Sequence, residues 1–498
     1  MRLVVADSVR KGRRAEQVEV RGVGQQRLVQ LRGIADRFLA AGEVMQTNGF
    51  AYIRLDIADL PSPHPYGLQL WQSEFEPILA DWVAGLGVAT IRSRDVVGLT
   101  ADDHGVDVDL SGGERLRAGY LVGCDGGRST VRKLAGIELA GLDAAASWMI
   151  AQVHLDEPEV GIRPEGGGIG PVHRDGTPGP FAVVLKERTI ELEIDPTFDD
   201  LRAALIAAYG TDFGARDPIW ISRFSDASRQ AVAYRSGRVL LAGDAAHIHP
   251  PHGGQGLNTG VQDAVNLGWK LAQVVAGTAP DGLLDTYHDE RHPVGAQVLR
   301  NVQAQVALTT PDPRHDSLRA VVAELLATDE GRRHMAGMMS GLSIRYDLAG
   351  SHPLVGWRVP DLALDTAHGL ARMFELLHAA RPVLVHLGEP GAVDLGGWAD
   401  RVRLVEATTD GPWELPVHGP VPAPTAILVR PDGHVAWAGD PADPALPDAV
   451  ATAMASAGVG GTQARRGLGI SSFASAGNRV DVSGNDLQGI AQGLDLAL

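Results

Sequence analysis

The residues best suited to chemistry lie where an apolar stretch ends and a helical pattern begins. Residues 237–247 read GRVLLAGDAAH, so the apolar stretch ends in Gly243-Asp244. This pattern predicts a buried strand, and ligands of open α/β sheets bind at the carboxyl ends of such strands. A carboxylate at that position can accept hydrogen bonds from ligand hydroxyl groups. The alternative is a tight turn in which Asp244 only caps the following helix.

The next segment adds a glycine-rich loop in front of a long predicted helix. Residues 250–258 read PPHGGQGLN, and the helical pattern runs from about 257 to 276. Glycines let the backbone approach a flat ligand closely. Free N–H groups at the start of a helix favour a partial negative charge on that ligand. The whole run is too particular for a plain turn, so it favours a ligand site.

A second run of this kind occurs earlier in the chain. Residues 120–132 read YLVGCDGGRSTVR, which places Asp125 and Gly126 at the end of another apolar strand. Arg128 could bind a phosphate oxygen of a ligand. The alternative is a glycine turn in which Arg128 pairs with a surface carboxylate. Because the first run is present in the same chain, we favour the ligand-binding interpretation.

Together the two runs resemble the FAD motifs of group A (para-hydroxybenzoate hydroxylase-type) flavoprotein monooxygenases, particularly the aromatic polyketide hydroxylases. The match continues through residues 258–271 and 284–293. The resemblance implies that Asp244 contacts the ribityl chain of FAD. It also implies that a set of loop residues lies against the isoalloxazine ring and helps form the oxygen site, namely Pro250, Gly253, Gly254, Gln255 and Gly256. It also implies NADPH or NADH as the reductant.

The resemblance implies a set of site residues. The expected cofactor-binding residues are Asp7, Arg27, Gln72, Asp125, Gly126, Arg128, Gly243, Asp244, Gly256, Leu257 and Asn258, and the expected catalytic residues are Pro250, Gly253, Gly254 and Gln255. For Gln72 a polar strand-end residue is an equal alternative, and for Arg27 the alternative is a solvated helix charge. His247, His249 and His252 crowd one Gly/Pro turn without carboxylates, so no metal site is expected.

The elements that must position these residues predict an α/β fold. The resemblance implies a Rossmann-like (GR2-type) FAD/NAD(P)-binding domain, an inserted β-sheet substrate domain and a C-terminal thioredoxin-like α/β domain. The expected boundaries are 1–144 and 226–350 for the two parts of the FAD-binding domain, 145–225 for the sheet, 351–455 for the C-terminal domain and 456–498 for an atypical tail. Within these, strands are predicted at 2–6, 149–154, 181–185 and 188–194, and helices at 75–86, 199–209 and 367–379.

The two ends of the chain depart from the family pattern. The family opens with a strand and Gly-x-Gly-x-x-Gly, whereas residues 22–27 read GVGQQR and lack the third glycine. Residues 1–7 instead resemble the family's second strand, so Asp7 is expected to bind the adenosine ribose and the first strand–helix unit to be absent. A late gene start or a truncated product with weak FAD affinity would account for this. Residues 469–486 resemble a loop of NDP-forming acyl-CoA synthetases and receive no activity.

Composition limits the partners. The net charge of -17 disfavours nucleic acid and anionic membrane surfaces. No apolar run is long enough to cross a bilayer. The single cysteine, Cys124, excludes an internal disulfide and any Cys-x-x-Cys chemistry in the C-terminal domain, for which a structural or dimerisation role is expected. A cytoplasmic location is the simplest interpretation, and a homodimer is one expected assembly.

The reaction implied by the resemblance has two halves. NAD(P)H reduces the flavin, and the reduced flavin reacts with O₂ to give a C4a-hydroperoxide that transfers one oxygen to an aromatic polyketide or phenol-like ring. The substrate is expected between the flavin and the inserted sheet, with Trp148, Ile150, Phe181 and Trp220 as candidate lining residues. Two alternatives remain: Baeyer–Villiger oxygenation on the same scaffold, and a truncated non-catalytic relative with impaired FAD binding.

Overall fold

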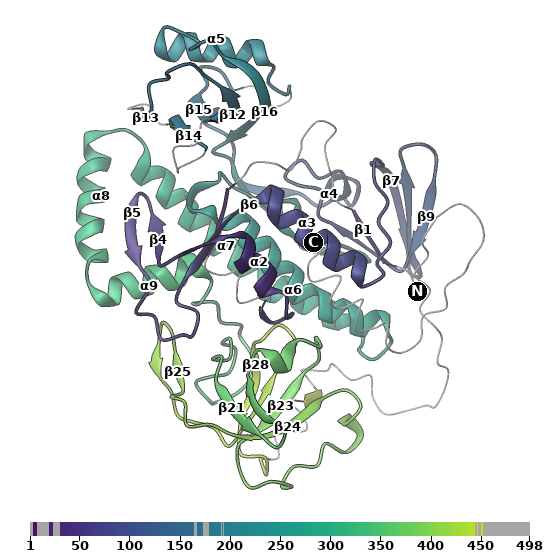
Figure 1. The fold of residues 1–498 in the computed structure, drawn as a ribbon. Coiled ribbons are helices and arrows are strands. Elements are labelled where there is room, and N and C mark those ends of the chain that lie inside the picture. Colours follow the sequence, from purple (N-terminus) through teal and green to yellow (C-terminus); the bar gives the residue numbers. More distant parts are fainter. Residues whose placement is uncertain are drawn as a thin grey trace.

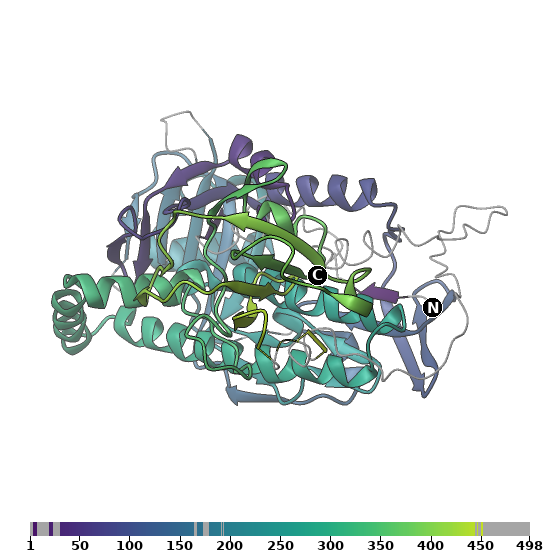
Figure 2. The ribbon, with the colours of Figure 1, turned by 90° about the horizontal axis from the view of Figure 1, so that it is seen from below.

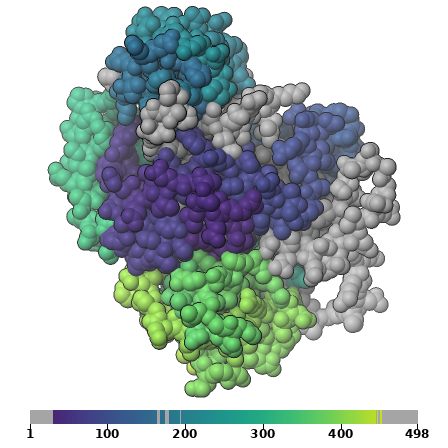
Figure 3. All heavy atoms as spheres, viewed as in Figure 1, coloured from purple at the N-terminus to yellow at the C-terminus, as the bar shows by residue number. Residues whose placement is uncertain are grey.

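The computed structural model describes residues 3–6, 19–22, 30–163, 167–172, 179–190, 192, 194–443, 446, 450 and 451. An inserted sheet lies at one end of the molecule, the C-terminal domain lies at the other, and long helices run between them (Figure 1). The helices are α2 (Ala35–Ala41), α3 (Gln72–Gly85), α4 (Thr130–Leu134), α5 (Phe198–Tyr209), α6 (Gln255–Val275), α7 (Asp285–Thr309), α8 (Pro313–Leu326) and α9 (Asp329–Ser340). The space-filling view shows the N-terminal part as a band between the two ends (Figure 3).

The central sheet carries the two glycine-rich turns. Its order is β1-β10-β19-β18, with bounds Leu3–Ala6 for β1, Tyr120–Gly123 for β10, Val239–Leu241 for β19 and Arg235–Ser236 for β18. The first three strands are parallel and β18 is antiparallel to β19. Every residue of β10 and β19 is buried, which explains why both strands read as continuous apolar runs.

Three small antiparallel sheets and one hairpin complete this part of the chain. The three-stranded sheets are β2 (Glu19–Gly22), β6 (Gly67–Trp71) and β3 (Glu43–Met45); β7 (Val96–Asp102), β8 (Gly105–Leu110) and β9 (Arg115–Ala118); and β11 (Leu139–Leu142), β17 (Ser228–Ala231) and β20 (His247–Ile248). The hairpin is β4 (Thr47–Phe50) with β5 (Ile53–Asp56). Gly112 and Gly113 have φ of 104° and 86°, so only glycine suits the turn between β8 and β9.

The inserted sheet has five strands and one covering helix. Its order is β13 (Gly161–Ile162), β14 (Gly167–Pro171), β15 (Phe181–Lys186), β12 (Ser147–His154) and β16 (Arg216–Ser225). Alternate residues of β12 pack against Leu201 and Leu205 of α5. Helix α5 lies on the outer side of this sheet, so the opposite face is turned toward the rest of the molecule (Figure 1).

The strand predicted at 188–194 is wrong for the residues that the structure describes there, and β16 supplies the additional strand instead. Alternation of apolar and polar residues suggested a strand. In the structure, however, arginine side chains donate hydrogen bonds to backbone carbonyl groups of this segment. In a strand, these carbonyl groups would accept hydrogen bonds from a neighbouring strand. Arg128 donates to the Leu192 carbonyl and Arg223 to the Ile194 carbonyl.

The C-terminal domain is built on a six-stranded mixed sheet. Its order is β22 (Gly369–Arg372), β21 (Ala363–Thr366), β24 (Arg403–Thr408), β23 (Val383–His386), β27 (Ala426–Val429) and β28 (Val435–Gly439), and a small hairpin joins β25 (Glu414–Leu415) to β26 (Gly419–Pro420). The helix predicted at 367–379 is wrong, because Gly369, with φ of 105°, closes a hairpin between β21 and β22. Only a short 3₁₀ turn, Glu375–Leu377, follows.

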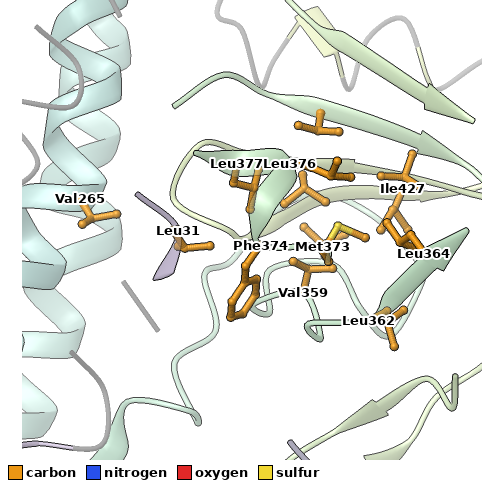
Figure 4. Packing of buried hydrophobic residues seen from close by; sticks show 14 of the residues in the cluster. Leu31, Val265, Val359, Leu362, Leu364, Met373, Phe374, Leu376, Leu377 and Ile427 are labelled. Atoms are coloured by element: carbon orange, nitrogen blue, oxygen red, sulfur yellow. The ribbon is translucent and has the colours of Figure 1, made fainter. Parts of the chain in front are cut away.

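The C-terminal domain shares a hydrophobic core with the part of the chain that carries the central sheet and α6. Phe374, Leu376 and Leu377 cluster with Val265 of α6 and with Leu31 (Figure 4). The view from below also places the C-terminal strands over the long helices (Figure 2). The α/β fold class with an inserted sheet and a separate C-terminal domain is therefore confirmed.

A buried ionic cluster joins the same two parts. Glu290 of α7 accepts hydrogen bonds from Lys270 of α6 at 2.9 Å and from Arg430 at 2.8 and 2.7 Å. Arg430 also contacts Asp432, whose carboxylate accepts from Trp269 Nε1 at 3.3 Å. Burial lowers the pKa of Lys270 to about 8. Burial alone would raise the pKa of Glu290, but Arg430 and Lys270 hold it below its usual range.

We predict that Arg430→Met destabilises the protein strongly. The substitution removes the cation that Glu290 and Asp432 share, and an uncompensated buried charge costs about 3–5 kcal/mol. The measurement is the free energy of unfolding in urea. Arg314→Met, which removes an exposed partner of Asp312, is the control and should leave stability unchanged. Equal stabilities for the two variants would contradict the role given to the cluster.

Candidate functional site

The two glycine-rich turns leave adjacent parallel strands at the same edge of the sheet. Gly123 of β10 is in register with Leu241 of β19. Asp125 follows Gly123 by two residues and Asp244 follows Leu241 by three, so both turns emerge side by side. On the other side of β10, Ala6 of β1 is in register with Gly123. The predicted cofactor residues Asp7 and Arg27 lie outside the described residues.

A buried arginine ties the two turns together. Arg132 of α4 donates to the Ala245 carbonyl at 3.0 Å and to the Gly127 carbonyl at 3.2 Å. Its exposed fraction is 4%. A Cβ placed on Gly127 would lie 3.4 Å from Ile248, so the turns also touch directly. Arg132 was not among the predicted site residues. The only feature of the sequence that could have indicated it is its place at the end of the run at residues 120–132.

Asp125 and Arg128 have contacts within the protein. The Asp125 carboxylate accepts from Ser129 Oγ, from Thr130 N at 2.6 Å and from Val131 N at 3.0 Å, and thereby caps the start of α4. Arg128 donates to the Leu192 carbonyl and lies 3.7 Å from Asp195. Gly126, with φ of 77°, provides the turn between them. The predicted contacts of these three residues with a cofactor therefore stay predictions.

The Asp244 turn opens toward the start of α6. Asp244 is exposed, and α6 begins at Gln255 without a side-chain cap. Gly253 and Gly254 have φ of 72° and 61°, a conformation that favours glycine at both positions. A Cβ placed on Gly256 would lie 3.8 Å from Asp244 Oδ1 and 3.4 Å from His249 Cε1. Gly256 therefore keeps open a space bordered by a carboxylate, an imidazole and the start of α6.

A fully buried carboxylate, Asp263 of α6, anchors the Asp244 turn to α6 and α7. Asp263 Oδ2 accepts from the Gly243 N–H at 3.1 Å and lies 2.7 Å from His247 Nε2, while Oδ1 accepts from Arg291 Nε at 2.7 Å. Burial would raise the pKa of Asp263, but Arg291 and His247 keep it below its usual value. A Cβ on Gly260 would lie 3.3 Å from the Cα of Gly243, so the helix packs directly on the turn. Asp263 and Arg291 were not predicted as site residues.

The side chains of the glycine-rich loop point mainly inward. Gln255 accepts a hydrogen bond from Asn301 Nδ2 at 2.8 Å, and Asn258 donates to the Gly254 carbonyl at 2.8 Å. Pro250 is buried, and a Cβ on Gly253 would lie 2.7 Å from Met339. Leu257 is partly exposed. The loop thus presents backbone rather than side chains to a ligand.

Gln72 has a local partner. It is the first residue of α3, and its side chain donates to Glu76 one turn later. The structure thus gives it a helix-surface contact, and its predicted approach to the cofactor stays a prediction.

The space beside Asp244 fits a flavin nucleotide. It offers a hydrogen-bonding carboxylate, a backbone cradle that a Cβ on Gly256 would fill, and the positive end of a 21-residue helix. It lies at the carboxyl ends of parallel strands, where nucleotide ligands of α/β sheets bind. Fold and site together define a dinucleotide-binding α/β flavoprotein.

Comparison with known families agrees with this class. Residues 5–302 match the FAD binding domain family, and residues 352–457 match the C-terminal domain of aromatic-ring hydroxylases. The chain belongs to this family of FAD-dependent aromatic hydroxylases and is a flavin-dependent monooxygenase.

Three similar proteins illustrate the relationship. The chain is 44% identical to a 12-dehydrotetracycline 5-monooxygenase/anhydrotetracycline 6-monooxygenase of Streptomyces rimosus, covering 83% of this chain and 86% of the relative. It is 42% identical to a rifampicin monooxygenase of Streptomyces venezuelae, covering 86% and 88%. The solved structure of an anhydrotetracycline hydroxylase from Streptomyces rimosus superposes with a TM-score of 0.83 at 40% identity, covering 91% and 94%. The Baeyer–Villiger and non-catalytic alternatives are not favoured.

The described part of the chain lacks the features of a metal site and of a membrane span. It holds no group of three or more His, Cys, Asp or Glu side chains suited to a metal ion. None of its helices is both long enough and apolar enough to cross a bilayer.

We predict that Gly256→Leu abolishes FAD binding without unfolding the protein. The new side chain fills the space between Asp244 and His249, while the backbone of Gly256 does not require a left-handed conformation. The measurement is FAD titration of the apoprotein, with circular dichroism to verify the fold. Gly85→Leu, at a position with open space at the end of α3, is the control. Normal FAD binding by Gly256→Leu would show that the cofactor lies elsewhere.

Proposed function

We propose that this monooxygenase hydroxylates a polycyclic phenolic substrate of the aromatic polyketide type, with O₂ as oxidant and NADPH or NADH as the source of electrons. The names of two relatives described above, a tetracycline monooxygenase and a rifampicin monooxygenase, support a large multi-ring substrate. The observation that carries the proposal is the composition of the inner face of the inserted sheet.

The inner face combines aromatic rings with buried polar atoms. Trp148 of β12 stacks on Phe224 of β16 with ring centroids 5.5 Å apart and an interplanar angle of 10°. Next along the two strands, Ile150 pairs with Ser222 and Gln152 with Trp220. The predicted lining residues Trp148, Ile150 and Trp220 all belong to this face.

Two polar atoms of this face are available to form hydrogen bonds with a ligand. Gln152 Oε1 and Trp220 Nε1 are buried, and no residue in the described part of the chain forms a hydrogen bond with either atom. An unpaired buried acceptor beside an unpaired buried donor is costly unless a ligand satisfies both. A hydroxyl and a carbonyl on one ring system would do so, while the aromatic pair supports the remaining rings. Phe181, which was also predicted to line the substrate site, instead packs against the core on the α5 side of the sheet.

The cofactor would be held by the other half of the site. Asp244, the backbone of residues 253–256 and the start of α6 would bind the flavin. Bound FAD supplies the electron transfer and oxygen activation that amino-acid side chains lack. The chain's own groups orient the flavin and substrate, and the start of α6 stabilises negative charge near its N–H groups. A cytoplasmic homodimer is part of the same proposal.

The reaction class is tested with ¹⁸O₂. We expect the protein reconstituted with FAD to consume NADPH or NADH with a hydroxynaphthoquinone or hydroxyanthraquinone and to place one labelled oxygen on a ring carbon. Comparing the rates with NADPH and NADH identifies the reductant. A labelled lactone would instead indicate Baeyer–Villiger oxygenation, and label-free product would contradict a monooxygenase reaction on this substrate class.

The cofactor half is tested with Asp244→Ala. The variant should lose retention of FAD through gel filtration because the carboxylate that binds ligand hydroxyls is gone. Flavin absorbance of the protein peak is the measurement, and Asp312→Ala, at an exposed helix cap, is the control. Unchanged flavin absorbance in Asp244→Ala would contradict the assignment of this residue.

The substrate half is tested with Gln152→Leu and Trp220→Phe. Each removes one hydrogen-bonding atom and should lower kcat/KM by about 2- to 10-fold, the usual value of one hydrogen bond. FAD affinity should not change, because both residues lie on the inserted sheet whereas Asp244 follows β19 of the central sheet. Arg216→Gln, an exposed change on β16, is the control. Unaltered kcat/KM in both variants would contradict the proposed recognition.

A further inference from the structure

His249 is partly buried at the border of the Asp244 space, and neither the motif nor the function accounts for it. Its Nδ1 lies 2.9 Å from the Pro250 carbonyl oxygen. Since a carbonyl oxygen only accepts, Nδ1 must carry the proton of this hydrogen bond. In a neutral imidazole the other nitrogen, Nε2, then presents a lone pair.

The Nε2 atom faces the space between the turn and the helix. A Cβ on Gly256 would lie 3.6 Å from it, and the same Cβ would lie 3.8 Å from Asp244 Oδ1. Nε2 is buried and has no hydrogen-bond partner among the residues that the structure describes. His247, two residues earlier, differs because its Nε2 contacts Asp263. His249 thus offers an unused acceptor where Asp244 offers a carboxylate.

The surroundings keep this imidazole neutral. Burial lowers the pKa of His249 below its ordinary value of 6.5, and the neighbouring His247 lowers it further, against opposing effects of the Pro250 carbonyl and Asp244. His252, the third histidine of the loop, also has a lowered pKa because of burial. Around pH 7 His249 is therefore an acceptor at Nε2.

We propose that His249 is a cofactor-positioning residue whose Nε2 accepts a hydrogen bond from an O–H or N–H group of FAD bound between Asp244 and the start of α6. The inference rests on the proposed function only in taking FAD as the occupant of this space. The donor is either a ribityl hydroxyl or an N–H of the flavin ring, and both share this chemistry. No proton is transferred: the imidazole fixes its tautomer on Pro250 and accepts from the cofactor.

The first test is FAD titration of apoprotein variants, in which quenching of flavin fluorescence reports binding. We expect His249→Phe to weaken FAD binding by about 10-fold, because the donor on FAD loses its buried acceptor. His249→Gln retains an acceptor oxygen and should recover most of the affinity. His104→Phe, at an exposed histidine in the turn between β7 and β8, is the control and should bind FAD as the unsubstituted protein does. Thermal melting of the apoproteins separates loss of binding from loss of fold.

The midpoint potential of the bound flavin distinguishes the two donors. If the ring N–H is the donor, His249→Phe shifts the potential as well as the affinity. If a ribityl hydroxyl is the donor, the affinity falls while the potential stays constant. Either result supports the inference. Unchanged affinity and unchanged potential in a folded His249→Phe variant would overturn it.

The pH dependence supplies a signature that a packing role would not produce. Protonation turns Nε2 from acceptor into donor, so FAD affinity should be constant above pH 6.5 and fall at lower pH. The other titratable groups at this position are Asp244, His247 and His252, and all three remain in His249→Gln. That variant should therefore lose only the part of the fall that belongs to His249. Absence of FAD binding in the unsubstituted protein would instead contradict the proposed function itself.

Discussion

The arrangement of the site depends on one buried carboxylate, Asp263. It receives the Gly243 N–H, His247 and Arg291 at once, and so joins the end of β19, the following turn and α7 to α6. A buried carboxylate persists only if its partners compensate for lost hydration, and here a guanidinium and an imidazole do so. The close packing of Gly260 on Gly243 follows from this anchoring. The space beside Asp244 therefore has a fixed wall before any ligand binds.

A second buried network connects α6 and α7 with the C-terminal domain. Glu290 and Arg291 are consecutive residues of α7, and they face different partners: Glu290 binds Arg430 and Lys270, whereas Arg291 binds Asp263. Tyr346 connects the two, because Arg291 donates to its hydroxyl at 3.4 Å and Arg430 lies 5.2 Å from its ring. The C-terminal domain therefore contacts α6 and α7 through these buried groups.

The sequence predicted those features that depend on local pattern. Strands β10 and β19 were predictable because burial on both faces makes them uniformly apolar, and the glycine turns because their conformations require glycine. The roles of Arg132 and Arg291 were not, because each acts on a group far away in the chain, such as Ala245 for Arg132. Residues 367–379 carry a helical pattern, but their apolar side chains belong to the core behind a hairpin. Local periodicity identifies buried residues without identifying their neighbours.

The two halves of the site differ in whether backbone or side chains are available to a ligand. On the cofactor side, Asp125, Gln255 and Asn258 direct their side chains to the protein, so the backbone and a few groups at the Asp244 turn remain to meet a ligand. On the opposite side, the inner face of the inserted sheet presents side chains that no described residue pairs, such as Gln152. Under the proposed function, changes on that face alter which substrate is recognised and leave the Asp263 network unchanged. The same proposal lets the fold keep one cofactor geometry while its sheet is adapted to different ring systems.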